Sequence, residues 1–275
     1  MHYQKTMIIS PSAKNICNTC GVRYGTSIIP TICEICADDR QYLGFSGQVW
    51  TSYNELATKS TIRFSRLLST VYDLRITPAF AIAQKAHLVL SSSGNVLWDC
   101  LPFIDDQTIA FIRSLGGISA IAISHPHYYS LMQDWATAFD CPIYLHASDR
   151  EWIKDPGGYI ELWNGPAKKL WDNISIVHVA GHFPGSTVLH LPDHGRAGCL
   201  LTGDSIYVAP SRRHMSFMYS YPNHIPLPKK DIEFIYEQVH PLPFDAMYGA
   251  FEWMNIAEGA RAIFERSISR HLSIY

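Results

Sequence analysis

Two pairs of cysteines near the start of the sequence have the spacing of a metal site. Cys17 and Cys20 form one CxxC pair, and Cys33 and Cys36 form a second pair after twelve intervening residues. Each CxxC turn aims two sulfurs at one point, and two such turns facing each other make a tetrahedral four-sulfur site that suits zinc. Because four protein ligands leave no open position, we expect a structural zinc knuckle here and not a catalytic ion.

The surroundings of the pairs favour this interpretation. Gly21 directly follows the first pair, where the turn of a knuckle needs a positive φ. Iron in a rubredoxin-type site is the main alternative, and four unrelated thiols are the other. The remaining cysteines occur in apolar stretches and are expected to be small buried hydrophobic residues: Cys100, Cys141 and Cys199.

A second set of metal-type side chains lies in the later part of the chain. It consists of His125 and His127, separated by one proline, then His182 and Asp204. Imidazole nitrogens and a carboxylate suit zinc, iron or manganese, and a metal held by them would polarise a carbonyl or lower the pKa of a water to about 7. Taken singly, each has an ordinary explanation: a surface histidine pair, a core histidine or a Gly-Asp turn. Their common position at strand ends makes the set specific.

The elements that must position these residues follow from the hydrophobic pattern. Ile109, Ile112 and Leu115 have helical spacing, and Ser92–Asn95 forms a turn between two apolar runs. Polar residues that collect at strand ends on one rim are typical of sites in α/β proteins. We expect strands at 86–91, 96–98, 118–123, 142–145, 174–179, 187–191, 198–202 and 244–248, and helices at 105–115, 128–139, 231–239 and 255–270.

From about residue 60 to its end, the chain resembles the metallo-β-lactamase superfamily. The strand followed by His125-Pro126-His127 resembles the first metal motif of that family, 181–186 resembles its Gly-His-x-x-Gly-Ser element, and 202–204 its Gly-Asp element. The hairpin that ends in Trp98-Asp99 resembles the strand of that family that ends in an aspartate near its first loop. The resemblance implies a four-layer αβ/βα sandwich with the metal site at one edge of the two sheets. It also implies hydrolysis of an ester, thioester, lactone, amide or phosphoester.

The sequence departs from the family pattern at the second metal. Tyr129 stands where that metal's aspartate is usual, Ser130 replaces its histidine, and residues 248–251 contain no histidine. The resemblance therefore implies at most one metal, held by the three histidines with Asp204, or an empty, degenerate site. Tyr129 and Asp204 are the candidate catalytic residues, and the alternative for Tyr129 is that it packs where a metal used to be. A rubredoxin-linked di-iron protein is a third interpretation, but its acidic ligands are missing.

Several other polar residues are weaker candidates. His146 ends another strand and is a candidate for the site, whereas His224 lies in a proline-rich loop and is expected to be structural. Arg212 and Arg213 are expected to be solvated loop charges. The second ring nitrogen of a metal-bound histidine needs a carboxylate or carbonyl partner. Asp99 and Asp204 are the candidates for this role, and Ser186 and Thr187 are candidate hydrogen-bonding residues near His182.

The composition restricts the class of protein to which the chain can belong. The chain has 275 residues, a net charge of −2, 47% hydrophobic and 17% charged residues. This is typical of a globular protein, which we divide into an N-terminal knuckle segment (1–50) and a metallo-β-lactamase-like domain (51–275). Without a basic stripe, a signal-peptide run or an apolar span, we expect a cytoplasmic protein that binds neither nucleic acid nor membrane. The leading hypothesis is a single-metal hydrolase of a small molecule; the alternative is a catalytically degenerate module that binds a ligand or partner.

Overall fold

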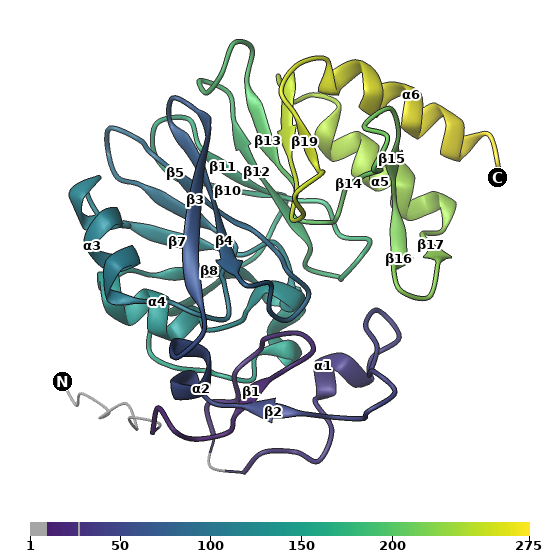
Figure 1. The fold of residues 1–275 in the computed structure, drawn as a ribbon. Helices are drawn as coiled ribbons and strands as arrows, with labels where there is room; N and C mark the ends of the chain where they lie inside the picture. Colours follow the sequence, from purple (N-terminus) through teal and green to yellow (C-terminus); the bar gives the residue numbers. More distant parts are fainter. Residues whose placement is uncertain (1–9, 27) are drawn as a thin grey trace.

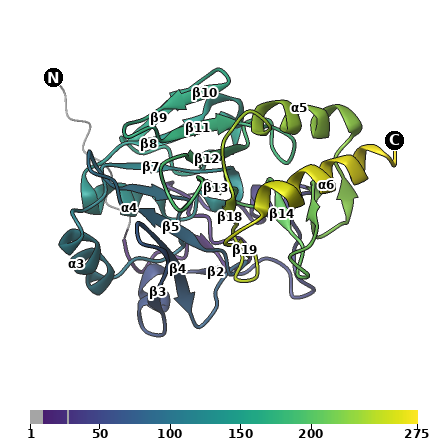
Figure 2. The ribbon, with the colours of Figure 1, turned by 90° about the horizontal axis from the view of Figure 1, so that it is seen from above.

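Two β-sheets packed face to face, with helices on the outside, form the body of the protein. The structure is a computed structural model that describes residues 10–26 and 28–275. Figures 1 and 2 show α3 and α4 outside one sheet and α5 and α6 outside the other. The expected four-layer αβ/βα sandwich is therefore present.

The first sheet has seven strands in the order β3-β4-β5-β6-β7-β8-β9. The pairs from β3 to β6 are antiparallel and those from β6 to β9 are parallel. Parallel neighbours need crossover connections; α3 (Asp106–Ser114) lies between β6 and β7 and α4 (Met132–Phe139) between β7 and β8, whereas a 3₁₀ segment lies between β8 and β9. The strands are β3 (Thr61–Leu68), β4 (Val71–Thr77), β5 (Ala86–Val89), β6 (Val96–Trp98), β7 (Ala120–Ala122), β8 (Ile143–His146) and β9 (Ile160–Trp163).

The second sheet has six strands in the order β10-β11-β12-β13-β18-β19. Its one parallel pair, β13 with β18, is connected through α5 (Lys229–Val239), and α6 (Ala260–Leu272) follows β19. Two small hairpins lie between β13 and α5: β14 (Tyr207–Val208) with β15 (Met215–Ser216), and β16 (Met218–Ser220) with β17 (Ile225–Pro226). The sheet strands are β10 (Ala167–Lys169), β11 (Ser175–His178), β12 (Thr187–Leu191), β13 (Cys199–Leu201), β18 (Ala246–Tyr248) and β19 (Asn255–Ile256).

Strand alternation divides the buried side chains among the layers. On β13, Cys199 and Leu201 join the cluster between the two sheets, whereas Leu200 joins the cluster beneath α5 and α6. This follows from the two-residue period of a strand, whose successive side chains point to opposite faces. Both faces of the strand are thus buried, which fixes its register and the position of the loop that follows it.

The N-terminal segment packs on the end of the first sheet. It contains β1 (Ile16–Cys17) paired with β2 (Trp50–Thr51), and the helices α1 (Glu34–Ala37) and α2 (Tyr53–Ala57). The Arg23 side chain donates two hydrogen bonds to Asp155 (2.9 and 2.7 Å), and its backbone N–H donates to the Ser130 carbonyl (3.2 Å). The four cysteines belong to the same buried cluster as Leu97 and Ile121 of the first sheet. The division at residue 50 stays a prediction, because β2 itself begins at Trp50.

Most expected elements are present, with two corrections. Helix α3 lies where predicted, and its N-cap Asp105 accepts a hydrogen bond from the Thr108 N–H (2.7 Å). The expected helix at 128–139 is interrupted, because a short 3₁₀ turn (Pro126–Tyr128) and Ser130 at φ 42° precede α4. The expected start of the last helix at residue 255 is wrong, since Asn255 and Ile256 pair with β18 and the helix begins only after Gly259.

The pattern analysis also missed the β3–β4 hairpin and the short strands β9, β10, β14 to β17 and β19. A second 3₁₀ segment (Ala147–Trp152) follows β8. Across residues 10–26 and 28–275, the helices are all too short or too polar to cross a membrane.

Candidate functional site

The structure forms two compact groups of metal-type side chains among the residues that it describes. In each group, one potential ligand atom per residue lies within 4.8 Å of the others, and all the residues are buried. The sequence-predicted residues are therefore brought together as expected, while metal binding by them stays a prediction. The groups are Cys17, Cys20, Cys33 and Cys36, and His125, His127, His182 and Asp204.

The cysteine group has the dimensions of a tetrahedral sulfur site. The Cys17 and Cys36 Sγ atoms are 3.6 Å apart, and those of Cys20 and Cys33 are 3.7 Å apart. Zinc–sulfur bonds of about 2.3 Å in a regular tetrahedron place the sulfurs about 3.8 Å apart. These two separations therefore agree with the size of a tetrahedral zinc–sulfur site.

Neighbouring groups hold the cysteine sulfurs in place. Gln48 Nε2 donates to Cys17 Sγ (3.2 Å), and the Tyr24 hydroxyl donates to Cys33 Sγ (3.7 Å). Such hydrogen bonds orient and stabilise thiolate ligands. Gly21 has φ 78°, as predicted, and a Cβ at this position would lie 2.6 Å from the Pro102 Cβ. The turn after the first cysteine pair therefore requires glycine for both its conformation and its close packing.

The histidine group is assembled from the ends of both sheets. His125 and His127 follow β7 of the first sheet, while His182 follows β11 and Asp204 follows β13 of the second. His125 Nε2 lies 3.0 Å from Asp204 Oδ1, and His182 Nε2 lies 3.8 Å from the same oxygen. His182 Nε2 is also 3.3 Å from His127 Nδ1. The nitrogens and the carboxylate oxygen thus converge on one point at the edge of the sandwich.

The outer ring nitrogens of two histidines have fixed partners. His182 Nδ1 lies 2.8 Å from the Tyr219 carbonyl oxygen and 3.2 Å from that of Met218. A carbonyl only accepts hydrogen bonds, so Nδ1 carries the proton and Nε2 keeps its lone pair facing the centre. His125 Nδ1 lies 3.0 Å from the Ser124 hydroxyl oxygen.

The sequence analysis named other residues for this supporting role. Asp99 does not contact a histidine ring but supports Ser124, because its carboxylate accepts a hydrogen bond from the Ser124 N–H (2.7 Å). Ser186 accepts from the Phe183 N–H (2.9 Å), and the Thr187 N–H donates to the Ser124 carbonyl (2.9 Å). Asp99, Ser186 and Thr187 therefore hold the loops that carry the histidines, and Ser124 and two backbone carbonyls contact the rings.

The electrostatics of the histidine group suit a cation. Burial lowers the pKa values of His125 and His127 well below the usual range, so both rings are neutral with free lone pairs at neutral pH. Burial also raises the pKa of Asp204, an effect that nearby His182 opposes. Within the described chain, His125 Nε2 and Asp204 Oδ1 are buried without a hydrogen-bond partner. Unpaired buried polar atoms are costly, and a metal ion at the centre would satisfy them.

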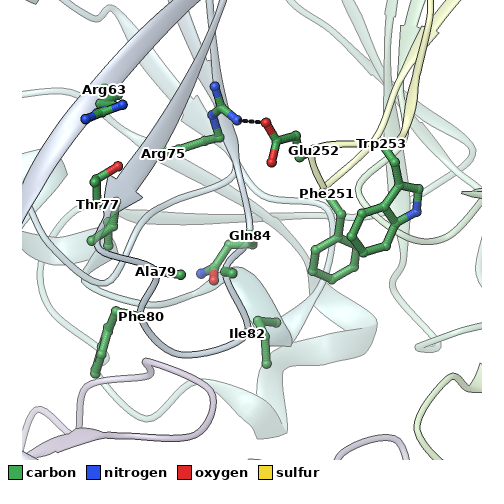
Figure 3. Close-up of a pocket in the computed structure, with 12 residues that line it drawn as sticks. Arg63, Arg75, Thr77, Ala79, Phe80, Ile82, Gln84, Phe251, Glu252 and Trp253 are labelled. Atoms are coloured by element: carbon green, nitrogen blue, oxygen red, sulfur yellow. Dashed lines mark hydrogen bonds and ion pairs between the residues drawn. The ribbon is translucent and has the colours of Figure 1, made fainter. Parts of the chain in front are cut away.

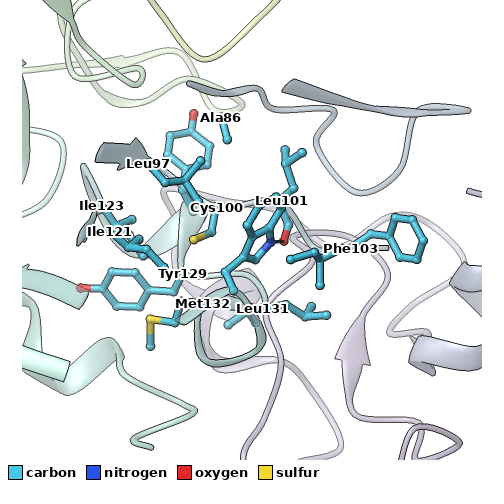
Figure 4. Close-up of a cluster of buried hydrophobic side chains, with 14 of the residues drawn as sticks. Ala86, Leu97, Cys100, Leu101, Phe103, Ile121, Ile123, Tyr129, Leu131 and Met132 are labelled. Carbon is cyan, nitrogen blue, oxygen red and sulfur yellow. Dashed lines mark hydrogen bonds between the residues drawn. The ribbon is translucent and has the colours of Figure 1, made fainter. Parts of the chain in front are cut away.

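The two tyrosines after His127 have different surroundings. The Tyr128 ring packs against His125 (centroids 4.5 Å apart), and Asp204 adds to the burial that raises the Tyr128 pKa. Both tyrosines belong to the same buried apolar cluster, in which Figure 4 shows Tyr129 near Ile121, Ile123 and Met132. The structure therefore favours Tyr128, the neighbour of the predicted Tyr129, as the phenol beside the histidines.

The positions that would serve a second metal have protein partners. Ser130 Oγ lies 3.0 Å from Gln84 Nε2, which donates to it. In the stretch 248–251, the Ala250 N–H donates to the Gly203 carbonyl (2.8 Å), next to Asp204. Gly203 has φ 55°, and a Cβ there would lie 2.5 Å from Ser124 Oγ. These loops pack against each other through hydrogen bonds that leave Asp204 as the carboxylate of the group.

The weaker candidates from the sequence lie elsewhere. His146 stacks on His178 (centroids 4.1 Å apart) and is not part of the histidine group. His224 is exposed in the β16–β17 hairpin, and Arg212 and Arg213 are exposed in the turn before β15. Their interpretation as loop residues agrees with these positions.

One cavity adjoins the histidine group, and a second cavity lies next to the first. A cavity of about 310 Å³ is lined by the centre itself and by Arg40, Tyr42 and Tyr221. A second cavity of about 470 Å³, shown in Figure 3, has Arg63 and Arg75 on one side and Trp253 on the other. Ile82, Ala83 and Phe251 line both cavities, which are therefore neighbours. Sequence analysis missed all of these wall residues, because no motif or period marks them.

Comparison with known proteins identifies the architecture. The model of the metallo-beta-lactamase superfamily matches residues 81–228, more than half of the chain. The Bacillus subtilis (strain 168) protein YmaE, described as uncharacterized, is 43% identical over 261 residues, which cover 94% of this chain and 95% of YmaE.

Solved structures show the same fold at low sequence identity. The metallo-beta-lactamase FIM-1 from Pseudomonas aeruginosa, in a mono-zinc form, has a TM-score of 0.56 at 14% identity, covering 78% of this chain and 96% of FIM-1. The metallo-beta-lactamase DIM-1 has a TM-score of 0.55 at 13% identity (79% and 100% covered). TTHA1623, in a di-iron-bound form, has a TM-score of 0.51 at 19% identity (70% and 96% covered).

Proposed function

The chain belongs to the metallo-β-lactamase superfamily, and from that premise we propose that it is a hydrolase with a single metal ion in its histidine centre. The substrate is a small ester, lactone or thioester. Superfamily membership supports metal-dependent hydrolysis. The ion would be held by the histidines predicted from the sequence, His125, His127 and His182, with the predicted carboxylate of Asp204 beside them.

One observation carries the proposal: buried ligand atoms converge without partners of their own. His125 Nε2 and Asp204 Oδ1 lie 3.0 Å apart, and neither has a hydrogen bond within residues 10–26 and 28–275. The backbone carbonyls of Met218 and Tyr219 accept from His182 Nδ1, so the Nε2 lone pair of His182 faces His125 and Asp204. Three histidines and an open position are a workable catalytic zinc shell.

The residues of the chain have distinct roles in this proposal. When bound, the metal would polarise a carbonyl and lower the pKa of a water. Asp204 accepts a hydrogen bond from the attacking water and orients it. Tyr128 packs against His125, and its buried hydroxyl, which has no hydrogen-bond partner among the described residues, is the phenol available to donate to the reacting groups. Tyr221 and Phe251 form walls of the cavity and limit the entry of other water.

The neighbouring cavity supports a more specific substrate. Its walls combine aromatic surface at Phe80 and Trp253 with the guanidinium groups of Arg63 and Arg75. Arg75 is already paired with Glu252 (2.6 Å), whereas Arg63 is exposed and has no ion pair within residues 10–26 and 28–275. We propose that an apolar arm of the substrate ends here in an anionic group, which Arg63 binds.

For the cysteine group, we propose a structural zinc and a reducing compartment. Its four sulfurs are buried and close the coordination shell, which leaves no position for a substrate. Thiolate ligands require cysteines that stay reduced, as they do in the cytoplasm. The proposed partner of the protein is a small molecule, and not nucleic acid or a membrane.

The first experiment is the metal content of the purified, zinc-saturated protein. The proposal predicts two equivalents per chain in the wild type and one in His127→Ala. It also predicts turnover of a member of an ester, lactone and thioester panel that disappears in this variant. One equivalent in the wild type, or full activity in His127→Ala, would overturn the hydrolase proposal.

A second candidate function has one observation in its favour. Tyr129 and Ser130 stand where ligands of a second metal are usual, and Ser130 is bonded to Gln84. This supports a ligand-binding or partner-binding module that kept the fold without the chemistry. It predicts one zinc per chain, held by the cysteines, and no turnover on the same panel.

A further inference from the structure

A short segment connects the cysteine knuckle to the histidine centre. The bridging segment, residues 38–42, directly follows α1, which carries Cys36. Its members Arg40, Gln41 and Tyr42 line the cavity beside His182 and Asp204. Figure 1 shows α1 on the side of the knuckle that faces the β16–β17 hairpin. A part of the knuckle therefore forms a wall of the proposed active site.

Arg40 is held rigidly within the bridging segment. Its Nε donates to Asp38 Oδ1 (2.6 Å) and its Nη2 to Asp38 Oδ2 (2.8 Å), while Nη1 lies 3.5 Å from the His182 carbonyl oxygen. The residue is only 8% exposed. A guanidinium held by a two-point carboxylate contact has a defined plane and position. Its charged end is therefore occupied by protein groups, which favours a positioning role over substrate binding.

Arg40 contacts the ring on which all three histidines pack. Its guanidinium carbon lies 4.0 Å from the centroid of the Phe183 ring. The same ring lies 5.5 Å from the His125 ring, 4.9 Å from that of His127 and 5.1 Å from that of His182. Displacement of Phe183 would therefore disturb three potential ligands at once.

The bridging segment makes a second connection through Asp39. The Asp39 carbonyl accepts hydrogen bonds from Ser220 Oγ (2.5 Å) and Asn223 Nδ2 (2.7 Å). Ser220 ends β16, the strand whose Met218 and Tyr219 carbonyls hold His182 Nδ1. The bridging segment thus contacts the backbone of His182 and also the strand that orients its ring.

We infer that the cysteine knuckle positions the histidine centre through Arg40 and Asp39, so that metal binding at the cysteines increases metal affinity at the histidines. The inference rests on the proposed function only for the identity of the second centre as a metal site. Coupling between two binding sites is reciprocal, so metal at the histidines also strengthens binding at the cysteines. Arg40 is a positioning residue in this arrangement.

Cobalt titration of the full-length protein separates the two centres. Co²⁺ bound by thiolates has intense near-ultraviolet charge-transfer bands, whereas Co²⁺ bound by nitrogen and oxygen has only weak visible bands. We expect Arg40→Ala to raise the Kd of the histidine centre by about 10- to 100-fold, the range for outer-shell partners of metal ligands. Arg40→Lys should restore little of the lost metal affinity, because an ammonium cannot make the two-point contact with Asp38. Arg196→Ala, at an exposed arginine in the β12–β13 turn, is the control.

Two further variants test the connection from the knuckle side. Cys36→Ser removes one sulfur ligand, and the double variant Ser220→Ala with Asn223→Ala cuts the Asp39 contacts while leaving all ligands intact. Both should raise the histidine-centre Kd. The double variant keeps the test valid if Cys36→Ser does not fold. An unchanged Kd in Arg40→Ala and in the double variant would overturn the inference.

Amide hydrogen exchange distinguishes failure of this inference from failure of the proposed function. We expect faster exchange at 181–186 and 218–220 in Arg40→Ala and in the double variant, with or without metal at the histidines. If the wild type binds no metal at the histidines, the hydrolase proposal fails, yet faster exchange would still support the positioning role. Unchanged exchange in both variants would refute that role even in an active enzyme.

Discussion

The two candidate metal centres differ in how the chain builds them. The cysteine group draws its four ligands from residues 17–36, on two local turns, whereas the ligands of the histidine group come from residues 125–204 and from both sheets. The cysteine group also closes on itself, while the histidine group opens on a cavity. A closed set of ligands contributes stability, and an open one provides room for chemistry.

The supporting contacts of the two centres differ in the same way. Gln48 and Tyr24, from the knuckle itself, donate to its sulfurs. The rings of His182 and His125 depend on carbonyls of β16 and on Ser124, which lie on different elements. The knuckle is therefore a local unit, and the histidine centre depends on the assembly of the whole sandwich.

The largest effect is expected from breaking the knuckle. In Cys36→Ser we expect loss of the structural zinc and a large fall in Tm. At free zinc 1,000-fold above its Kd, binding stabilises a protein by about 4 kcal/mol, which corresponds to roughly 10 °C in a domain of this size. Cys141→Ala, at a buried cysteine outside both centres, should keep the zinc. Thermal unfolding with and without chelator measures the difference; zinc retention and an unchanged Tm in Cys36→Ser would contradict it.

Removal of the carboxylate from the histidine centre should lower activity strongly and leave stability nearly unchanged, the reverse of Cys36→Ser. In Asp204→Ala we expect turnover to fall at least about 100-fold, since the metal's contribution to the barrier is several kcal/mol. The metal-free protein should keep or gain stability, because the lost carboxylate is buried and its Oδ1 has no partner among the described residues. Steady-state kinetics and chelator-treated unfolding curves check both parts. A fall in metal-free Tm as large as that of Cys36→Ser would remove the contrast between the centres.

A smaller effect is expected from the support of a single ring. Ser124→Ala removes the hydroxyl 3.0 Å from His125 Nδ1. We expect the metal affinity of the histidine centre to fall by about 10-fold, the low end of the range for outer-shell partners. Competition with a chromophoric chelator measures this, and the cysteine-bound metal serves as the internal control. An unchanged affinity would mean that the ring is held by packing alone.

The smallest expected effect is a difference in kcat between variants of the adjacent residues Tyr128 and Tyr129. Tyr128→Phe should lower kcat by about 2- to 10-fold, as expected for loss of one hydrogen bond of about 0.5–1.5 kcal/mol. Tyr129→Phe should leave kcat unchanged, because the ring that packs against His125 is that of Tyr128, while Tyr129 lies near Ile121 and Met132 (Figure 4). The reverse ranking would restore the role that the sequence pattern assigned to Tyr129.

Residue types and local spacing determined a large part of this protein. The two CxxC pairs predicted the cysteine group, and Gly21 predicted its positive φ, because these features depend on turns of a few residues. The strand-end motifs with His125, His182 and Asp204, and the resemblance they carry, predicted the sandwich and the convergence of these side chains. Helix α3 was predictable from its period and its Asp105 cap.

The tertiary structure decided what depends on contacts between distant segments. It placed Tyr128 and not Tyr129 beside His125, because a 3₁₀ turn replaces the regular helix that the pattern predicted. It also brought Arg40 to Phe183 and the β16 carbonyls to His182, although these partners are far apart in the sequence. A local pattern records the conformation of a few residues, whereas such contacts arise from the packing of whole elements, which no short stretch of sequence contains.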